Sequence, residues 1–308
     1  MFKARAHRFL VPFKGKFRIA DCPTEPDKDD KHDKDWDSKL EKAALDVGEW
    51  QQKLYSRGNF AMLIVLQALD AAGKDGTIRH VFSRINPCGL HVASFKQPSA
   101  VEVTHDFLWR TVPHLPARGN VAVFNRSYYE EVLVVRVHPK FLDSQRLPDK
   151  PNKHFWKERF RAIVEHERHL AEEGTIVLKF WLNISKDEQR KRLLERIEDP
   201  NKHWKFNAHD LDERALWDDY MDAYQDCLEA TSKPWAPWYA IPGDDKPFAR
   251  LQVAKLVNDT FERLDLEFPK ATAADLAEIK KARARLLSTA RSSRNSSDGS
   301  GRTTMKIW

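Results

Sequence analysis

Short apolar runs recur along the chain and are separated by longer amphipathic stretches. The most continuous run covers residues 60–69 (FAMLIVLQAL) and is followed at once by Asp70. Uninterrupted runs of this length are typical of strands that are buried on both faces, as they are in parallel sheets. Further runs of this kind occupy residues 91–95, 120–124, 175–184 and 238–241. The pattern therefore predicts a sheet of five strands.

Helical periodicity fills the intervals between these runs. It covers residues 40–57, 155–171, 186–197, 211–230 and 246–264. Alternation of buried strands with amphipathic helices predicts an α/β fold, in which helices flank a five-stranded parallel sheet. Ligands of such doubly wound sheets bind at the carboxyl ends of the strands. The loops that directly follow the strands are therefore the candidate site.

The two ends of the chain differ in composition from its middle. Residues 1–39 are predicted to be an N-terminal extension, because residues 21–39 are dense in interleaved charge. Residues 40–268 form the predicted α/β domain. Residues 269–308 form a basic tail that is predicted to be helical to about Leu287 and disordered over the polar residues 292–304.

Charge and composition narrow the class of protein. Residues 271–308 hold eight basic and three acidic residues, which accounts for +5 of the formal net charge of +6. The positive charge is therefore no evidence that the folded body binds nucleic acid. No apolar run approaches the roughly 20 residues that span a bilayer, and the three cysteines are too far apart for a CxxC pair. We expect a cytoplasmic protein that binds neither membranes nor nucleic acid.

A candidate phosphate-binding loop follows the first strand. Residues 69–77 read LDAAGKDGT and precede a helical pattern. Backbone N–H groups at a helix start, together with a lysine, bind phosphate well. The candidate phosphate-binding residues are Ala72, Gly73, Lys74, Gly76 and Thr77. The same segment also fits an ordinary glycine turn with surface charges.

This loop departs from the usual GxxxxGK[ST] pattern at two places. Ala68 stands where the first glycine belongs, and Asp75 stands where a serine or threonine normally holds Mg²⁺. A carboxylate at position 75 can hold the ion through a formal charge. Asp70 lies at the end of the strand and is a second carboxylate within reach of the same ion.

Two other segments carry candidate phosphate-binding cations. Arg126 follows a buried strand within NRSYYE, and a guanidinium suits a bidentate grip on phosphate. Its alternative role is a pair with a nearby carboxylate such as Glu130. Arg192 and Arg196 are one helical turn apart, so they share a helix face and can close over an anionic ligand as a lid. Interleaved acidic residues make a solvated helix the alternative there.

Taken together, these segments resemble the family-2 polyphosphate kinases. The matching motifs are residues 70–77 (DAAGKDGT), 95–99 (FKQPS), 105–110 (HDFLWR), 124–130 (FNRSYYE), 235–238 (WAPW) and 241–246 (IPGDDK). The resemblance covers about residues 40–266. It implies a P-loop kinase fold similar to thymidylate kinase, with a helical lid at about residues 185–208.

The resemblance also implies an activity. Such enzymes transfer the terminal phosphoryl group of inorganic polyphosphate to a nucleotide, reversibly, and Glu130 resembles the glutamate of the class III subgroup that uses AMP as well as ADP. An ATP-dependent nucleoside monophosphate kinase on the same fold is the alternative. The attacking group is already an anionic phosphate, so no general base is needed and charge neutralisation dominates.

Residue roles follow from the same resemblance. The expected catalytic residues are Asp70, Lys74, Asp75, Arg126 and Arg192, and the phosphate-binding set adds Arg196. Nucleotide binding is expected from Lys96, Asn125 and Glu130, and Mg²⁺ or Mn²⁺ binding from Asp70, Asp75 and Asn125. Asn125 stands where the family has an acidic residue, so binding of the metal ion is expected to depend mainly on Asp70 and Asp75. A homo-oligomer, a dimer or a tetramer, is also expected.

Overall fold

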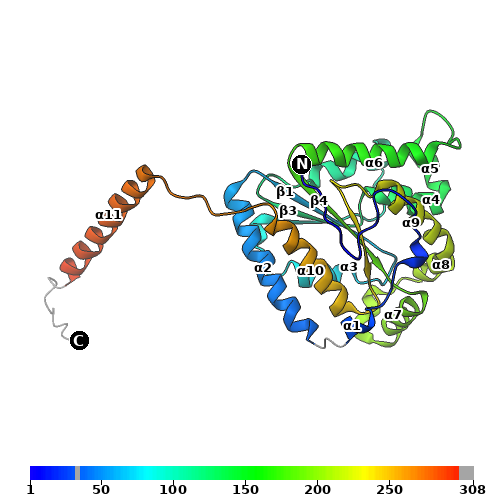
Figure 1. Ribbon diagram of the computed structural model, residues 1–308, viewed down its shortest axis with the longest axis horizontal. Coiled ribbons are helices and arrows are strands. Elements are labelled where there is room, and N and C mark those ends of the chain that lie inside the picture. Colours follow the sequence, from blue (N-terminus) through cyan, green and yellow to red (C-terminus); the bar gives the residue numbers. More distant parts are fainter. Residues whose placement is uncertain (32–34, 298–308) are drawn as a thin grey trace, which may run out of the picture. The chain divides into compact units, whose positions relative to one another are not determined.

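The computed structural model of this protein describes residues 1–31 and 35–297 (Figure 1). It comprises two units, residues 1–267 and 268–308, and each is treated by itself. None of the helices within the described residues is both long enough and apolar enough to cross a membrane.

The first unit is built on a parallel sheet of five strands in the order β2-β3-β1-β4-β5. The strands are β1 (Ala61–Gln67), β2 (Leu90–Ser94), β3 (Val121–Asn125), β4 (Thr175–Asn183) and β5 (Trp238–Pro242). Every residue of β1, β4 and β5 is buried, which is why these strands read as continuous apolar runs. The predicted α/β fold and all of its strands are confirmed.

Helices cover both faces of this sheet (Figure 1). Side chains alternate along β1, so Ile64 packs against α2 (Trp36–Arg57), α3 (Lys74–Val81) and α10 (Lys246–Glu262). Val65 points to the opposite face, toward α6 (Phe155–Glu172) and α9 (Trp217–Thr231). The sheet thus lies between two apolar cores.

The remaining elements are short or peripheral. The other α-helices of this unit are α1 (Lys28–Lys31), α4 (Val134–Val137), α5 (Leu142–Gln145), α7 (Lys186–Glu198) and α8 (His209–Ala215). The 3₁₀ turns are η1 (Ile19–Asp21), η2 (Pro87–Gly89), η3 (Glu102–Thr104), η4 (Trp109–His114), η5 (Tyr128–Val132), η6 (Pro139–Phe141) and η7 (Pro200–Lys205). The single helix predicted over residues 211–230 is interrupted, because Leu216 leaves the α conformation with φ −89° and ψ 21°.

The N-terminal segment belongs to the body, in contrast to the predicted extension over residues 1–39. Phe9 and Val11 are buried at 6% and 1% exposure. Val11 N donates to Trp238 O at 2.9 Å and Ala240 N donates to Phe9 O at 2.8 Å, so this segment pairs antiparallel with the edge strand β5. It covers a strand edge that would otherwise stay open.

The second unit contains α11 (Ala273–Ser297). This helix continues past the predicted end at Leu287 and includes the first residues of the segment that was predicted to be disordered. The rest of that segment, residues 298–304, lies outside the described residues.

Candidate active site

The candidate phosphate-binding loop lies between β1 and α3, at the place that the sequence predicted for it. Ala71 and Gly73 have φ values of +64° and +103°, so the chain turns sharply into the helix. Lys74 is the first residue of α3, and the N–H groups of a first helical turn have no partner within the helix. The loop therefore presents several backbone donors beside a lysine.

Lys74 folds back over its own loop. Its Nζ donates to Ala68 O at 2.8 Å and to Leu69 O at 3.2 Å. Burial, with the nearby charge of Arg126 as the second cause, lowers the pKa of Lys74 to about 8. Burial disfavours the charged form of a lysine. A phosphate that binds beside Lys74 would therefore stabilise its ammonium strongly, because the phosphate supplies opposite charge.

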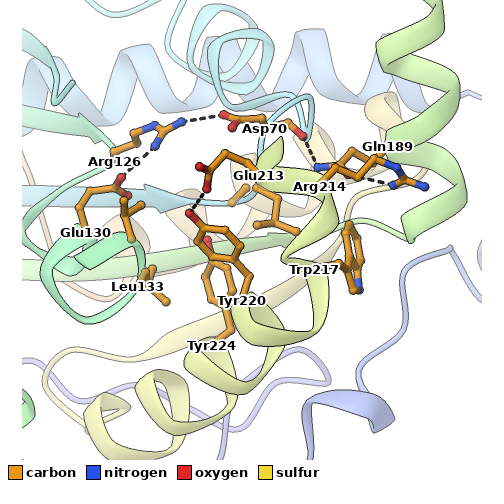
Figure 2. A pocket seen from close by; sticks show the side chains of 13 residues that line it. Asp70, Arg126, Glu130, Leu133, Gln189, Glu213, Arg214, Trp217, Tyr220 and Tyr224 are labelled. Carbon is orange, nitrogen blue, oxygen red and sulfur yellow. Dashed lines mark hydrogen bonds and ion pairs between the residues drawn. The ribbon is translucent and has the colours of Figure 1, made fainter. Parts of the chain in front are cut away.

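Arg126 is held between two carboxylates. Nη2 lies 2.6 Å from Asp70 Oδ1, and Nη1 lies 2.8 Å from Glu130 Oε2 (Figure 2). These partners, Glu130 first, raise the pKa of Arg126 above its ordinary value. Its backbone φ is +62°, an uncommon conformation for a residue with a side chain. The two roles considered for Arg126 are therefore compatible, because a paired guanidinium also lines the cleft.

Glu130 uses both of its oxygens. Oε2 accepts from Arg126 and Oε1 accepts from Gln67 Nε2 at 2.9 Å. Gln67 is 1% exposed and ends β1. Glu130 thus holds the Arg126 side chain in the cleft, and the hydrogen bond from Gln67 orients the Glu130 carboxylate.

Asn125 and Asp75 lie together on the other side of the loop. Asn125 Nδ2 donates to Asp75 Oδ1 at 2.6 Å. Asp70 is drawn toward Arg126. Within the described residues, no group of three or more His, Cys, Asp or Glu side chains is arranged to hold a metal ion. Mg²⁺ commonly uses one or two carboxylates, waters and substrate phosphates instead, so a site of two aspartates and one amide still fits it.

Arg192 was expected to be a catalytic and phosphate-binding residue of the lid, and its contacts in the structure are with the protein itself. This side chain is 3% exposed, and it is committed to protein acceptors. It donates to the carbonyl oxygens of Ala72 at 3.0 Å, Gly243 at 2.7 Å and Asp244 at 2.9 Å, and its Nε donates to Glu188 at 2.7 Å. Arg192 therefore ties the phosphate loop to the loop after β5, and it does not lie on the surface of a lid.

The predicted lid, residues 185–208, divides into two parts. The first part of α7 is anchored, since Gln189 and Leu193 are buried together with Arg192. The second part includes η7, where Trp204 is 79% exposed. Arg196 lies between these parts and its Nη1 pairs with Asp210 Oδ2 at 2.9 Å.

The predicted site residues converge on one cleft of about 1260 Å³. The predicted residues that line it are Asp70, Ala72, Gly73, Lys74, Asp75, Gly76, Lys96, Asn125, Arg126, Glu130, Arg192 and Arg196. Thr77 is the exception, because it is 2% exposed and its Oγ1 donates to Gly73 O at 3.2 Å.

Six cations that line this cleft were not predicted to be site residues: Arg79, Arg110, Lys202, Lys205, Lys246 and Arg250. The guanidinium of Arg250 lies against the loop, since a Cβ at Gly76 would come within 2.9 Å of its Nη2. Burial and the charge of Arg79 lower the pKa of Arg250. A sequence signal for Arg79 was available, because it lies on the same short helix α3 as Lys74, five residues later. None existed for Arg250, which only the tertiary fold brings to the loop.

A small polar hollow of about 30 Å³ lies beside Asp70 and Arg126, with room for a water molecule (Figure 2). Glu213 and Tyr220 line it, and the Tyr220 hydroxyl donates to Glu213. His138 Nε2 lies 3.0 Å from the same carboxylate. This contact holds α8 and α9 together beneath Asp70.

A phosphate-binding loop between a parallel strand and a helix, with an arginine and carboxylates around it, defines a P-loop phosphotransferase. The family model for polyphosphate kinase 2 (PPK2) matches residues 30–269. The chain belongs to the polyphosphate kinase 2 family and is a polyphosphate:nucleotide phosphotransferase.

Relatives of similar length support this assignment. A Rhodopseudomonas palustris protein named ADP-polyphosphate phosphotransferase is 49% identical over 287 residues, which is 92% of this chain and 99% of that protein. A Meiothermus ruber protein named AMP/ADP-polyphosphate phosphotransferase is 47% identical over 224 residues, 73% of this chain and 80% of that protein. The crystal structure of polyphosphate kinase 2 from Arthrobacter aurescens superposes with a TM-score of 0.77 at 39% identity, covering 88% of this chain and 95% of that chain.

Proposed function

We propose that this enzyme transfers the terminal phosphoryl group of polyphosphate to AMP as well as to ADP, reversibly and with Mg²⁺ or Mn²⁺. The observation that carries the proposal is the pairing of Glu130 with both Gln67 and Arg126. The names of relatives leave the acceptor open, since the relatives at 49% and 47% identity bear different names.

Glu130 supports AMP use because it fixes Arg126 before any acceptor arrives. The family resemblance implies asparagine at this position in the subgroups that are restricted to one nucleotide. Asparagine carries no charge and has one carbonyl oxygen in place of the two carboxylate oxygens that Glu130 uses, so it would hold the Arg126 guanidinium less firmly. With Glu130 present, Arg126 is held in place without the β-phosphate of the acceptor. AMP, which lacks that phosphate, can therefore be accommodated.

The donor side of the cleft is proposed to be the cation group Arg79, Lys246 and Arg250. Burial is the main cause that lowers the pKa of Lys246 and Arg250, and neighbouring cations add to it. Arg79 and Arg250 form no ion pair within the described part of the chain. A linear polyanion that leaves the loop in this direction relieves their mutual repulsion.

Transfer then depends on position and charge. The attacking phosphate oxygen of the nucleotide is anionic at neutral pH, so the residues need not remove a proton from it. Lys74 and Arg126 neutralise the phosphates at the transfer point, and the backbone N–H groups of α3 orient them. Arg192 contributes by keeping the loop carbonyls, and hence the loop itself, in place.

A divalent cation would suit the carboxylates around the transfer point. Lys74 and Arg126 carry two positive charges there, whereas Asp70, Asp75 and Glu130 carry three negative ones. The other cations of the cleft lie farther along it, so a metal ion would balance the aspartates where the phosphates meet. Asp75, Asn125 and Asp70 would hold Mg²⁺, which supplies the missing positive charge. Chelation with EDTA should abolish transfer, and Mg²⁺ or Mn²⁺ should restore it.

The acceptor is tested with purified protein, Mg²⁺ and polyphosphate in the absence of ATP. With AMP, ADP should appear first and ATP later. Glu130→Asn removes one charge-assisted hydrogen bond, so it should lower kcat/KM for AMP by about tenfold or more relative to that for ADP. Glu173→Asn, at an exposed carboxylate outside the cleft, is the matched control. No product from AMP, or an equal loss with both acceptors, would refute AMP use through Glu130.

We also propose that the enzyme is a homo-oligomer, a dimer or a tetramer. Light scattering of the purified protein checks this, and a mass equal to one chain would contradict it.

A further inference from the structure

A fully buried polar cluster lies beneath the segment that carries Arg126 and Glu130. Lys179, in the middle of β4, and Glu167, on α6, are both 0% exposed. Lys179 Nζ lies 2.5 Å from Glu167 Oε2 and donates to Tyr129 Oη at 2.8 Å and to Thr231 O at 2.9 Å. All three ammonium protons therefore have acceptors.

The cluster continues into η5 through two tyrosines. The hydroxyls of Tyr128 and Tyr129 donate to Glu167 Oε1 at 2.9 Å and 2.8 Å. These tyrosines lie directly between Arg126 and Glu130 in the chain, with Ser127 as the turn residue. Their hydroxyls therefore tie the backbone next to both cleft residues to α6 and β4.

The backbone of this segment needs such an anchor. Arg126 has a φ of +62°, and Ser127 is fully extended with φ −168° and ψ −162°. A residue with a side chain keeps a left-handed conformation only where its surroundings hold it there. Two hydrogen bonds brace the turn, from Tyr129 N to Ser127 Oγ at 3.1 Å and from Glu130 N to Ser127 O at 3.1 Å.

Stability alone does not account for a buried ion pair. Apolar residues of similar volume often stabilise a core as well as such a pair or better, because removing two charges from water is unfavourable. What an ion pair with directional hydrogen bonds can add is a unique position for the groups bonded to it.

We propose that Lys179, Glu167, Tyr128 and Tyr129 form a positioning cluster that fixes Arg126 and Glu130 for phosphoryl transfer. The cluster touches no substrate and acts through the turn at residues 126–127. Its effect on ADP phosphorylation rests on the family activity, and only its effect on AMP rests on the proposed acceptor range.

A fourfold variant separates positioning from stability. Tyr128→Phe, Tyr129→Phe, Glu167→Leu and Lys179→Met together replace the cluster by apolar side chains of similar size. The variant should unfold at a temperature near that of the wild type, since no buried charge is left unpaired. Its kcat with ADP and polyphosphate should fall by about tenfold or more, because small displacements of reacting groups are costly. KM for polyphosphate should stay unchanged, because the cations on the donor side are intact.

An unchanged rate in the fourfold variant would contradict the proposal. If the fourfold variant has wild-type kcat with ADP, the cluster only stabilises the fold and the proposal is wrong. Because ADP is the acceptor in this assay, a failure of AMP use leaves the conclusion untouched.

A single substitution decides the question if the fourfold variant does not fold. Tyr129→Phe removes one hydroxyl and leaves the Lys179–Glu167 pair in place. It should lower kcat per folded molecule, with the folded fraction measured by circular dichroism. Tyr239→Phe is the control, because Tyr239 is 4% exposed and packs in the core on the other face of the sheet. Equal kcat in both single variants would overturn the proposal.

Discussion

Lys74 should lower the stability of the folded enzyme at neutral pH, although it is proposed to bind the transferred phosphate. Burial lowers its pKa from the usual 10.5 to about 8. Below pH 8 the folded protein holds a partly buried ammonium, whereas the unfolded chain solvates it fully. Lys74→Met removes this cost together with the charge that binds phosphate.

The sign and size of the effect follow from proton linkage. Between pH 8 and 10.5 the unfolded chain binds a proton at Lys74 that the folded protein has released, so the free energy of unfolding rises with pH. Integrating over the interval from about pH 7 to about pH 9.5 gives a rise of about 2 kcal/mol at about 1.4 kcal/mol per pH unit. Solvent screening of this partly exposed side chain makes the figure an upper bound.

Urea unfolding of wild type and Lys74→Met at several pH values measures the difference. The free energy of unfolding of the wild type should rise relative to that of the variant by up to about 2 kcal/mol as the pH goes from about 7 to about 9.5. Groups that titrate in both proteins cancel in this comparison. Lys255→Met, at an exposed lysine of α10, is the matched control. A difference between wild type and Lys74→Met that does not change with pH would refute the reasoning.

Two further substitutions test which cation binds polyphosphate and which one holds the loops in place. Arg250→Ala should raise KM for polyphosphate several-fold with little change in KM for the nucleotide, whereas Lys255→Ala on the exposed side of α10 should change neither; initial rates at varied polyphosphate check this. Arg192→Leu should destabilise the protein by about 3 kcal/mol or more and lower kcat, because buried carbonyls lose their donor. Arg190→Leu, at an exposed arginine of α7, should do neither, and denaturant unfolding together with kcat measurements distinguishes the two.

The sheet and its loops were predictable because their signals are local. A strand such as β1, buried along its whole length, has to be apolar at every position, and the loop after it has to begin a helix with a lysine. Parallel strands bring their carboxyl ends to one edge, so Asp75 and Asn125 could be placed near each other without coordinates. The structure brings them into hydrogen-bond contact.

The role of Arg192 was not predictable, because its acceptors come from distant parts of the chain. The sequence around it reads as a charged, solvated helix, and nothing local marks one arginine as buried. Its partners at Gly243 and Asp244 follow β5, and those at Ala71 and Ala72 precede α3. The sequence gives a weak indication of a special role for Lys179, since it is a lone charge within an otherwise apolar strand. Its ion-pair partner Glu167 could not be identified from the spacing of the two residues.

The same edge of the sheet shows how the groups around the cleft are fixed in place. Three connections converge there: Lys74 bonds to its own loop, Arg192 crosses from α7, and Asp244 N donates to Thr24 O of the N-terminal segment at 2.9 Å. Donors and charges that are fixed in advance need not reorganise during transfer, which is where electrostatic catalysis gains most. The cost appears as strained backbone at Arg126 and a disfavoured charge at Lys74. Hence the substitutions that remove this cost should be those that remove activity, and the pH dependence of Lys74→Met measures one part of it directly.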